Sequence, residues 1–192
     1  PLEGSDGAIL RARELSAAAP QRYWYADQYN NPANPLSHEL TTGPEIWRAT
    51  RGRLTHVVAG VGTSGTLIGT GRYLKAKRPG IRLVAVQPAG PLHGLEGLKH
   101  LATAIVPGIY DAALVDETIY VTTEAAEARV RSLAREGGLF VGWSTGAALV
   151  AAADVLARAA ADRFGPPVVV VIAPDGGAAY LSEERRLFGE EA

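Results

Sequence analysis

A glycine-rich loop between a β-branched strand and a helix constrains the fold of this chain most strongly. Residues 54–61 (LTHVVAGV) are apolar and β-branched and end in glycine, which predicts a buried strand. Residues 62–65 (GTSG) form a tight loop, and residues 66–77 have the pattern of a helix that stops at Pro79. The run 81–86 predicts the next strand. Residues 54–87 therefore form a βαβ unit, which is typical of a parallel sheet.

The same alternation of helical and strand patterns continues along the chain. We expect helices at 7–19, 37–49 (with a break near Gly43), 123–136 (capped by Thr122 or Thr123), 147–163 and 180–188. Further strands are expected at 23–25, 118–121, 139–141 and 168–172, and a long Gly/Pro-rich loop at 88–116. This order predicts an α/β fold: a doubly wound, mostly parallel sheet with helices on both faces.

Composition excludes several classes of function. The 192 residues suffice for one domain, or for one domain and part of another. With 19 basic and 20 acidic residues, the chain lacks the basic excess of a nucleic-acid binder. It has no cysteine for disulfides, thiolate metal sites or nucleophilic catalysis, its four histidines show no metal-ligand spacing, and no apolar run is long enough to cross a membrane. Because the chain begins at Pro1 and has no methionine, we expect a processed chain or a piece of a longer one.

The loop itself, GVGTSG at residues 60–65, has a G-x-G-x-x-G pattern between strand and helix. Glycines permit a tight turn there, and the free N–H groups at a helix start attract an anion, so the pattern indicates a phosphate site. It also fits a glycine turn that serves packing alone. A dinucleotide site is disfavoured because Gln87 stands where an acidic residue should end the next strand, and a P-loop is excluded because no Gly-Lys-Ser/Thr follows.

A second motif, GWSTG at residues 142–146, formally matches the nucleophile elbow of serine hydrolases. Such a triad needs Asp and then His after the serine, whereas every histidine of this chain precedes Ser144. The hydrolase interpretation therefore fails. Ser144 remains either an N-cap or a hydroxyl that bonds a cofactor heteroatom.

A third group of polar residues occupies two turn-rich segments, 28–35 (QYNNPANP) and 41–45 (TTGPE). Their amides and hydroxyls are able to bind a small carboxylate, or to satisfy their own turns. Taken alone, the segments favour the turn interpretation.

Together, and in this order, the motifs resemble cysteine synthases, pyridoxal-phosphate (PLP) enzymes of fold type II with the tryptophan-synthase-β-like fold. The resemblance rests on NPANP (31–35), TTGPEIW (41–47), GVGTSGTL (60–67), GWSTGAA (142–148) and PDGGAAYLS (174–182). The short segment around 94–111 is more similar to the cysteine synthase B branch. The resemblance covers about residues 4–189.

The resemblance implies roles for individual residues. Gly62, Thr63, Ser64, Gly65 and Thr66 match the loop that grips the cofactor phosphate, with Ser64 where the family usually has glycine. Ser144 matches the serine that bonds the pyridine nitrogen, and a neutral hydroxyl there implies an unprotonated ring. Gln28 matches a glutamine near the substrate carboxylate. The chain departs from the family at Gln87, where an acid is common, and at 177–179 (GAA), where a charged residue is usual.

No residue of this chain matches the family's Schiff-base lysine. The three lysines are Lys75 and Lys77 on a helix and Lys99 in the long loop, so the resemblance places the catalytic lysine, with the Ser/Thr-Gly-Asn loop, upstream of Pro1. We therefore expect no catalytic residue in these 192 residues. They look like the C-terminal three-fifths of a family member.

The resemblance implies PLP-dependent β-replacement on O-acetylserine or O-phosphoserine with a sulfur donor, giving L-cysteine. Alternatives are a related lyase such as cystathionine β-synthase or serine/threonine dehydratase, a non-catalytic PLP- or phosphate-binding fragment, and, least favoured, a nicotinamide-binding module. We expect residues 1–36 to belong to a smaller substrate-side domain and residues 37–192 to the large PLP-phosphate domain. The resemblance further implies a cytoplasmic homodimer that binds small molecules. From the composition and the histidine spacing we expect no metal, nucleic acid or membrane as a partner.

Overall fold

The computed structural model describes residues 4–160 and 165–183. Its helices are α1 (Gly4–Ala18), α2 (Ala33–Leu40), α3 (Thr42–Ala49), α4 (Gly65–Lys77), α5 (Thr123–Gly137) and α6 (Trp143–Arg158), with a 3₁₀ helix η1 (Gly177–Tyr180). Its strands are β1 (His56–Gly60), β2 (Arg82–Pro88), β3 (Glu117–Val121) and β4 (Val169–Val171). The expected βαβ unit is β1–α4–β2.

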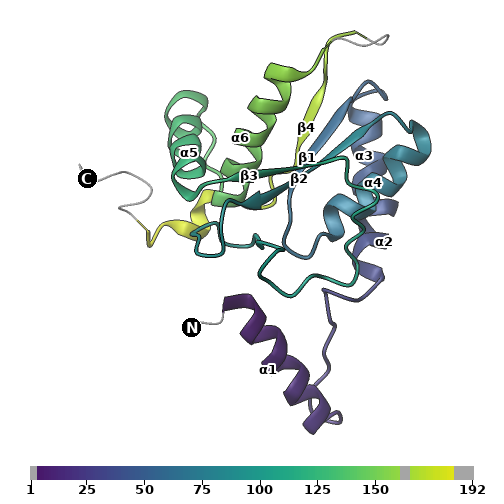
Figure 1. The fold of residues 1–192 in the computed structure, drawn as a ribbon, viewed down its shortest axis with the longest axis vertical. Helices are drawn as coiled ribbons and strands as arrows, with labels where there is room; N and C mark the ends of the chain where they lie inside the picture. Colours follow the sequence, from purple (N-terminus) through teal and green to yellow (C-terminus); the bar gives the residue numbers. More distant parts are fainter. Residues whose placement is uncertain (1–3, 161–164, 184–192) are drawn as a thin grey trace.

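The four strands form one parallel sheet in the order β3-β2-β1-β4 (Figure 1). β1 lies in the middle, with Val58 opposite Val84 of β2 on one side and Val171 of β4 on the other. Since all strands run the same way, their carboxyl ends meet at one edge, where ligands bind in open α/β sheets.

Each face of the sheet carries its own apolar core, because successive strand side chains point to opposite faces. Val58, Val84 and Val86 pack with the inner faces of α5 and α6. Val57, Leu83 and the neighbouring alanines pack with α4 and α3 on the other face. Figure 1 shows α5 and α6 on one side of the sheet and α2, α3 and α4 on the other. The predicted doubly wound α/β architecture is confirmed.

Several predicted elements differ in the structure. Residues 23–25 form no strand, and Trp24 is 87% exposed. The helical segment expected at 37–49 begins at Ala33 and divides at Thr41, because Thr42 starts a second helix. Segment 139–141 contributes a single bridge, between Val141 and Gly176. Most of the predicted helix 180–188 lies outside the described residues. Within them, Tyr180 is the last residue of η1.

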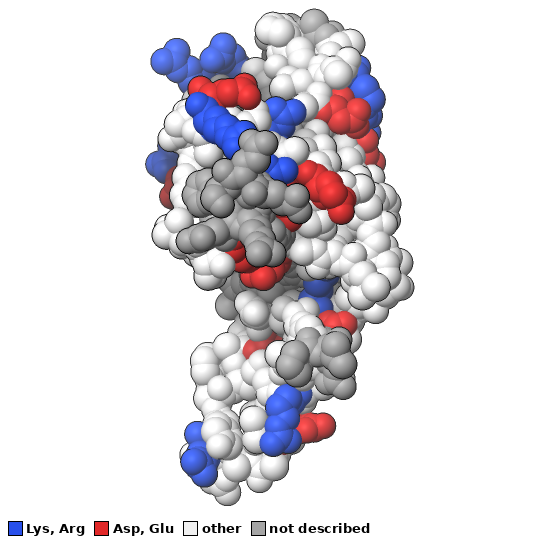
Figure 2. All heavy atoms as spheres, turned by 90° about the vertical axis from the view of Figure 1, so that its left-hand side faces the viewer, with Lys and Arg blue, Asp and Glu red and all other residues white. Residues whose placement is uncertain are grey.

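The helix α1 extends away from this body (Figures 1 and 2). Its main attachment is at its first turn, where Asp6 accepts hydrogen bonds from Lys99 and from the backbone N–H of Ile105 at 2.7 Å. On the face drawn in Figure 2, basic and acidic side chains are interspersed. Among the described residues, no helix is long and apolar enough to cross a membrane, and no cluster of His, Asp and Glu is arranged to hold a metal ion.

Candidate functional site

A cavity of about 400 Å³ opens at the carboxyl edge of the sheet, where β1 ends at Gly60. The start of α4 borders it at one end and the start of α6 at the other. Its lining residues are Gln28, Tyr29, Gly60, Gly62, Thr63, Ser64, Thr66, Glu96, Gly97, Leu98, Ser144, Pro174, Asp175 and Tyr180. The first and second sequence motifs, which lie some eighty residues apart, therefore face one another across a single space.

The α4 end of the cavity presents backbone donors. The Ile68 N–H of α4 donates a hydrogen bond to the carbonyl of Ser64, the loop residue before the helix, at 3.0 Å. Among the described residues, the N–H groups of Gly62, Thr63, Ser64 and Thr66 have no acceptor. A helix N-terminus also carries about half a positive charge. These donors, with the Thr63 and Thr66 hydroxyls, suit a phosphate.

Close neighbouring atoms leave no room for a side chain at Gly62 or Gly65. A Cβ at Gly62 would lie 2.3 Å from the Gly97 carbonyl oxygen, and a Cβ at Gly65 would lie 1.8 Å from Asn34 Oδ1. Ser64, by contrast, has a left-handed backbone (φ +71°), a conformation that favours glycine. Its buried hydroxyl has no hydrogen-bond partner among the described residues.

The third sequence motif packs against the loop and holds it from outside. Asn34 Nδ2 donates to the Gln28 carbonyl at 2.8 Å and to Thr63 Oγ1 at 3.2 Å. On the neighbouring turn, the His38 ring joins Thr66 Oγ1 (3.1 Å) to Thr42 Oγ1 (2.9 Å). Burial lowers the pKa of His38, which favours the neutral ring, in which one nitrogen donates to its hydroxyl and the other accepts from its hydroxyl. These polar residues therefore orient the loop as well as their own turns.

At the opposite end of the cavity, Ser144 belongs to a network of hydroxyl and carboxylate groups. Ser144 Oγ donates to Asp175 Oδ1 at 3.0 Å, and the Tyr180 hydroxyl donates to Asp175 Oδ2. Burial, and then the Asp175 carboxylate, raise the pKa of Tyr180. The α6 helix begins at Trp143, four residues before the predicted start, so Ser144 lies in its first turn.

Backbone contacts fix the position of Asp175. The Gly142 N–H donates to the Asp175 carbonyl at 3.2 Å, and the Gly177 N–H donates to the Phe140 carbonyl at 3.0 Å. A Cβ at Gly142 would lie 2.0 Å from Asp175 Oδ2, so only glycine leaves room for the carboxylate. Gly142 thus allows a chain segment more than thirty residues away to pack closely against the start of α6.

The charge in the cavity is unevenly distributed. Its described lining holds two carboxylates, Glu96 and Asp175, and neither a lysine nor an arginine. A bound phosphate would therefore depend on the uncharged donors and the helix end of α4, away from Asp175. The cavity suits a ligand with an anionic end at the loop and a polar or cationic end near Ser144.

Two glutamines of the sequence analysis have distinct positions. Gln28 lines the cavity, and its backbone carbonyl accepts from Asn34. Gln87 is buried, and its side-chain oxygen accepts from the Leu101 N–H at 2.9 Å. Gln87 therefore anchors the long loop that follows β2.

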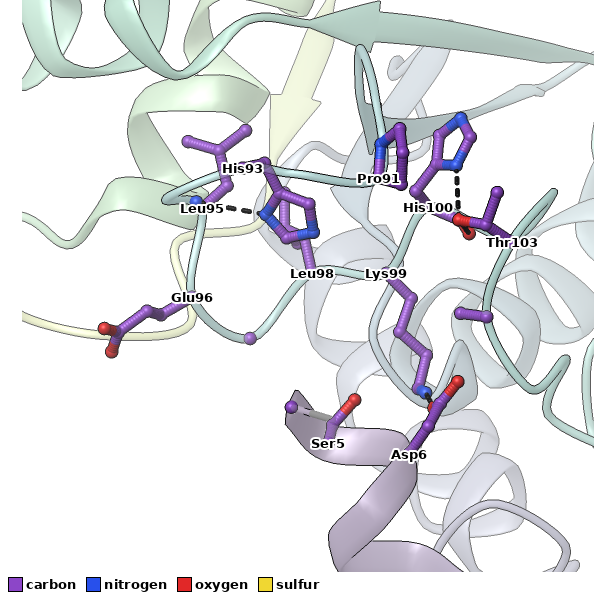
Figure 3. A pocket seen from close by; sticks show the side chains of 13 residues that line it. Ser5, Asp6, Pro91, His93, Leu95, Glu96, Leu98, Lys99, His100 and Thr103 are labelled. Atoms are coloured by element: carbon purple, nitrogen blue, oxygen red, sulfur yellow. Dashed lines mark hydrogen bonds and ion pairs between the residues drawn. The ribbon is translucent and has the colours of Figure 1, made fainter. Parts of the chain in front are cut away.

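A second cavity of about 490 Å³ adjoins the first and shares Glu96, Gly97 and Leu98 with it (Figure 3). It lies between the first turn of α1 and the loop after β2, and includes His93 and His100. Lys99 points from this loop to Asp6 of α1. Only 4% of Lys99 is exposed, and its ammonium group lies 5.0 Å from the centre of the Tyr29 ring.

The other lysines lie away from both cavities. Lys75 pairs with Asp116 at 2.7 Å, and Lys77 lies over the Tyr73 ring. No lysine is among the described residues that line the first cavity.

Sequence reasoning missed Asp175, Tyr180, His38 and Lys99. Asp175 and Tyr180 lie in the PDGGAAYLS block, to which the sequence analysis assigned no functional residue. The block's place in the resemblance was the one available signal. His38 gave none, because a lone histidine between two turn motifs has no pattern.

Residues 3–175 match the family model described as "Pyridoxal-phosphate dependent enzyme". The chain is 53% identical over 182 residues to a cysteine synthase of Aquifex aeolicus, covering 95% of this chain and 55% of that protein. It is 39% identical over 189 residues to cysteine synthase B of Escherichia coli, covering 98% and 59%. The chain thus spans little more than half the length of these relatives.

Solved structures give the same picture. An O-acetylserine sulfhydrylase isoform from Entamoeba histolytica matches with a TM-score of 0.84 and 34% identity, over 97% of this chain and 56% of that one. An O-acetylserine dependent cystathionine β-synthase from Helicobacter pylori matches with a TM-score of 0.84 and 35% identity, over 94% and 59%. The fold, the glycine loop at the carboxyl edge and these similarities lead to one conclusion: the chain belongs to the family of pyridoxal-phosphate dependent enzymes.

Proposed function

We propose that this chain forms the cofactor-phosphate part of a cysteine synthase, an enzyme of β-replacement that makes L-cysteine from O-acetylserine or O-phosphoserine and a sulfur donor. One observation carries the proposal: the open N–H groups at the start of α4 face Ser144 across one cavity. The similarity to cysteine synthases and O-acetylserine sulfhydrylases supports this choice of reaction.

The polar groups that line the cavity are arranged to match pyridoxal phosphate, with its phosphate at the start of α4 and its ring nitrogen near Ser144. The N–H groups of Gly62, Thr63, Ser64 and Thr66 and the hydroxyls of Thr63 and Thr66 would hold the phosphate, and Ser144 would contact the ring nitrogen. Gln28 is proposed to lie near the substrate carboxylate. Pyridoxal phosphate supplies an electron sink for reactions at the α and β carbons of an amino acid.

For these 192 residues alone, we propose binding without turnover. Lys75 and Lys99 are held by Asp116 and Asp6, and Lys77 lies over Tyr73, so the chain presents no lysine to the cavity. A nucleophilic lysine that is also the base for the α-proton would have to come from outside this chain.

Equilibrium dialysis with pyridoxal phosphate tests the site. Gly65→Asp places a carboxylate against the phosphate and a Cβ against Asn34, so we expect at least a hundredfold loss of affinity. Gly80→Asp is the matched control, because a Cβ at Gly80 meets nothing within 4 Å. Equal affinity of the two variants would refute the assignment of the phosphate loop.

The finer parts of the proposal concern the substrates and the assembly. A cystathionine-forming enzyme is the second candidate, favoured by the Helicobacter pylori neighbour, and product analysis with sulfide against homocysteine separates the two.

Resemblance alone supports a cytoplasmic homodimer for the full-length enzyme. We also propose that the large domain begins with α2, before the boundary expected at residue 36, because Asn34 and Pro35 already contact the loop and α4.

A further inference from the structure

Two threonine hydroxyls at the α4 end of the first cavity each have a partner on α2. Asn34 Nδ2 donates to Thr63 Oγ1 at 3.2 Å, and Nε2 of the His38 ring lies 3.1 Å from Thr66 Oγ1. Asn34 and His38 are four residues apart, so they lie on the same face of α2. Both threonines line the cavity, whereas neither α2 residue is among its described lining residues. The helix α2 therefore contacts the phosphate loop from the side away from the cavity.

The close approach of α2 to α4 fixes the His38 ring in place. A Cβ at Gly69 of α4 would lie 2.0 Å from the Pro35 carbonyl oxygen and 2.9 Å from the Cβ of His38, so only glycine permits this packing. On the far side of the ring, Thr42 Oγ1 of α3 lies 2.9 Å from Nδ1. The ring is thus held between two hydroxyls, one from α3 and one from α4.

Thr63 shows how a hydroxyl of this loop is oriented for an anion. Its oxygen accepts from Asn34 Nδ2 and from the Gly65 N–H at 3.3 Å. An amide nitrogen of this kind is only a donor, so neither bond uses the proton of the threonine hydroxyl. That proton stays available for an anion bound in the cavity.

The Thr66 hydroxyl is oriented in the same way by one of the two neutral forms of His38. Burial lowers the pKa of His38, so its ring carries a single proton, on Nδ1 or on Nε2. An unprotonated Nε2 would take the Thr66 proton for itself and leave only lone pairs facing the cavity. A protonated Nε2 donates to Thr66 Oγ1 and leaves the Thr66 proton free, while Nδ1 accepts from Thr42.

A bound phosphate distinguishes these two forms. A phosphate ester above neutral pH is a dianion whose oxygens are all acceptors. It requires the proton of the Thr66 hydroxyl, and therefore the form of His38 in which Nε2 carries the hydrogen. The hydrogen bonds then run in one direction, from Thr42 to His38, from His38 to Thr66 and from Thr66 to the phosphate.

We propose that His38 is a positioning residue whose Nε2–H donates to Thr66 and so directs the Thr66 hydroxyl at the phosphate of bound pyridoxal phosphate. The inference rests on the proposed function, since it requires the phosphate at the start of α4. His38 has a competing, purely structural role, because its ring also ties α2 to α3 and α4. Such a tie would hold with the proton on either nitrogen, and the tests below separate the two roles.

NMR of the His38 ring nitrogens tests the proposal on the wild-type chain. The ¹⁵N-labelled 192-residue chain is titrated at about pH 8, above the ordinary pKa of histidine, with pyridoxine 5′-phosphate. This compound carries an alcohol in place of the aldehyde and forms no bond to lysine. In the complex, we expect the shifts of a ring that is protonated on Nε2 and unprotonated on Nδ1.

Two references accompany this measurement. His56 also has its Nδ1 near a threonine hydroxyl, Thr55 Oγ1 at 2.8 Å, but it begins β1 at the end of the strand away from the cavity. Its ring should not respond to the ligand. Pyridoxine, which lacks the phosphate, should leave the His38 ring as it is in the unliganded chain. An equal response to both compounds would show that the phosphate does not set the ring form, and would overturn the proposal.

Two substitutions separate the roles of the two ring nitrogens. The amide of His38→Gln reaches the place of Nε2 and is able to donate to Thr66, whereas that of His38→Asn reaches only the place of Nδ1. In equilibrium dialysis with pyridoxine 5′-phosphate, His38→Gln should bind within about twofold of wild type. His38→Asn should bind about tenfold more weakly, on the scale of one hydrogen bond to a charged group. Leu40→Asn, at a 67% exposed position of α2, is the control and should leave the affinity unchanged.

A double-mutant cycle tests whether His38 acts through Thr66. Thr66→Val removes the hydroxyl and should weaken binding about tenfold by itself. Adding His38→Asn to Thr66→Val should cause no further loss, because the two residues act in series. Losses that multiply would show that His38 acts by another route, and would overturn the proposal. Urea unfolding of each variant separates a loss of affinity from a loss of stability.

The outcomes distinguish the two proposals. A complex with the proton on Nδ1, or equal affinities of His38→Gln and His38→Asn, would mean that the ring only ties the helices together, and the further inference would be wrong. The NMR result decides the matter even if both variants fail to fold. The proposed function survives a negative result as long as the wild-type chain binds and Gly65→Asp does not. If the wild-type chain does not bind pyridoxine 5′-phosphate, both proposals fail.

Discussion

Ser64 has a left-handed backbone at a position where glycine would be less strained. Its φ of +71° costs a non-glycine residue roughly 1–2 kcal/mol, and its buried hydroxyl has no partner among the described residues. Under the proposed function the position tolerates serine, because it would bind the phosphate through its backbone N–H.

We therefore predict that Ser64→Gly stabilises the chain by about 0.5 to 1 kcal/mol, since relief of the left-handed strain exceeds the entropy that glycine adds to the unfolded state. Pyridoxal-phosphate affinity should be retained. Ser132→Gly on the outer face of α5 is the control and should destabilise by roughly 0.5 kcal/mol. Urea unfolding measures both, and destabilisation by Ser64→Gly would show that the serine hydroxyl contributes more than its backbone costs.

Local sequence signals predicted a residue group at each end of the cavity but missed Asp175 and Tyr180 beside Ser144. Gly62–Thr66 and Ser144 each lie in a glycine-flanked motif at the start of a helix, a pattern contained within a few residues. The Ser144–Asp175 bond spans 31 residues and depends on the bridge between Val141 and Gly176. A contact of this kind follows from tertiary pairing, which no local pattern contains.

Among the elements, α1 is attached through Asp6 at its first turn and a weak contact of Arg13 with Asp27 at 3.9 Å. Burial raises the pKa of Asp6, but hydrogen bonds from Lys99 and the Ile105 N–H outweigh it and bring the pKa below its usual range. An ion pair and a backbone bond thus hold the first turn of α1, and Ile9, one turn further on, is buried.

We predict that Lys99→Met or Asp6→Asn releases α1. Breaking one partner of a largely buried ion pair leaves the other uncompensated, so amide exchange in residues 7–18 should accelerate by about tenfold or more while β1 and β2 stay protected. Arg11→Met, which breaks only the exposed pair with Glu14, is the control. Uniform acceleration along the whole chain would contradict a local attachment.

The same contact gives a pH dependence with a defined sign. Because the folded pKa of Asp6 is lowered, its contribution is complete above the unfolded pKa and is lost as the pH falls through the lowered, folded value. Exchange in α1 should therefore stay slow while ordinary aspartates are being protonated, and rise only at lower pH. In Asp6→Asn this dependence should be absent, which hydrogen exchange at a series of pH values would reveal.

The helices and strands were predicted correctly where the hydrophobic period and the length of the segment indicated the same type of element. β1, β2, α4 and α5 were each predicted to within about two residues, because long apolar runs and a Thr122 cap mark them. The aromatic run 23–25 has strand propensity but no neighbouring strand to pair with, and remains extended loop. The early start of α6 at Trp143 was hidden by the glycines that flank it.

Across the chain, the sheet order β3-β2-β1-β4 brings the starts of α4 and α6 to one edge. The sequence predicted a parallel sheet but contained no signal for the placement of β4 beside β1. That placement follows from the two apolar cores, which cover opposite faces of the same central strands.

The assembled site predicts cofactor binding without covalent attachment by this chain. After borohydride treatment with pyridoxal phosphate, intact mass should show no stoichiometric adduct under conditions where dialysis shows saturable binding. A single adduct that maps to Lys99, the buried lysine beside the second cavity, would overturn this prediction. Lys75 and Lys77 serve as internal references for nonspecific reaction, since both lie on the outer part of α4.

A crystal structure of the 192-residue chain with pyridoxal phosphate would show directly where the cofactor binds. We predict the phosphate within hydrogen-bond distance of the N–H groups of Gly62, Thr63, Ser64 and Thr66, and the ring nitrogen beside Ser144. A phosphate bound instead among His93, Lys99 and His100 in the second cavity, or a ring turned away from Ser144, would contradict it.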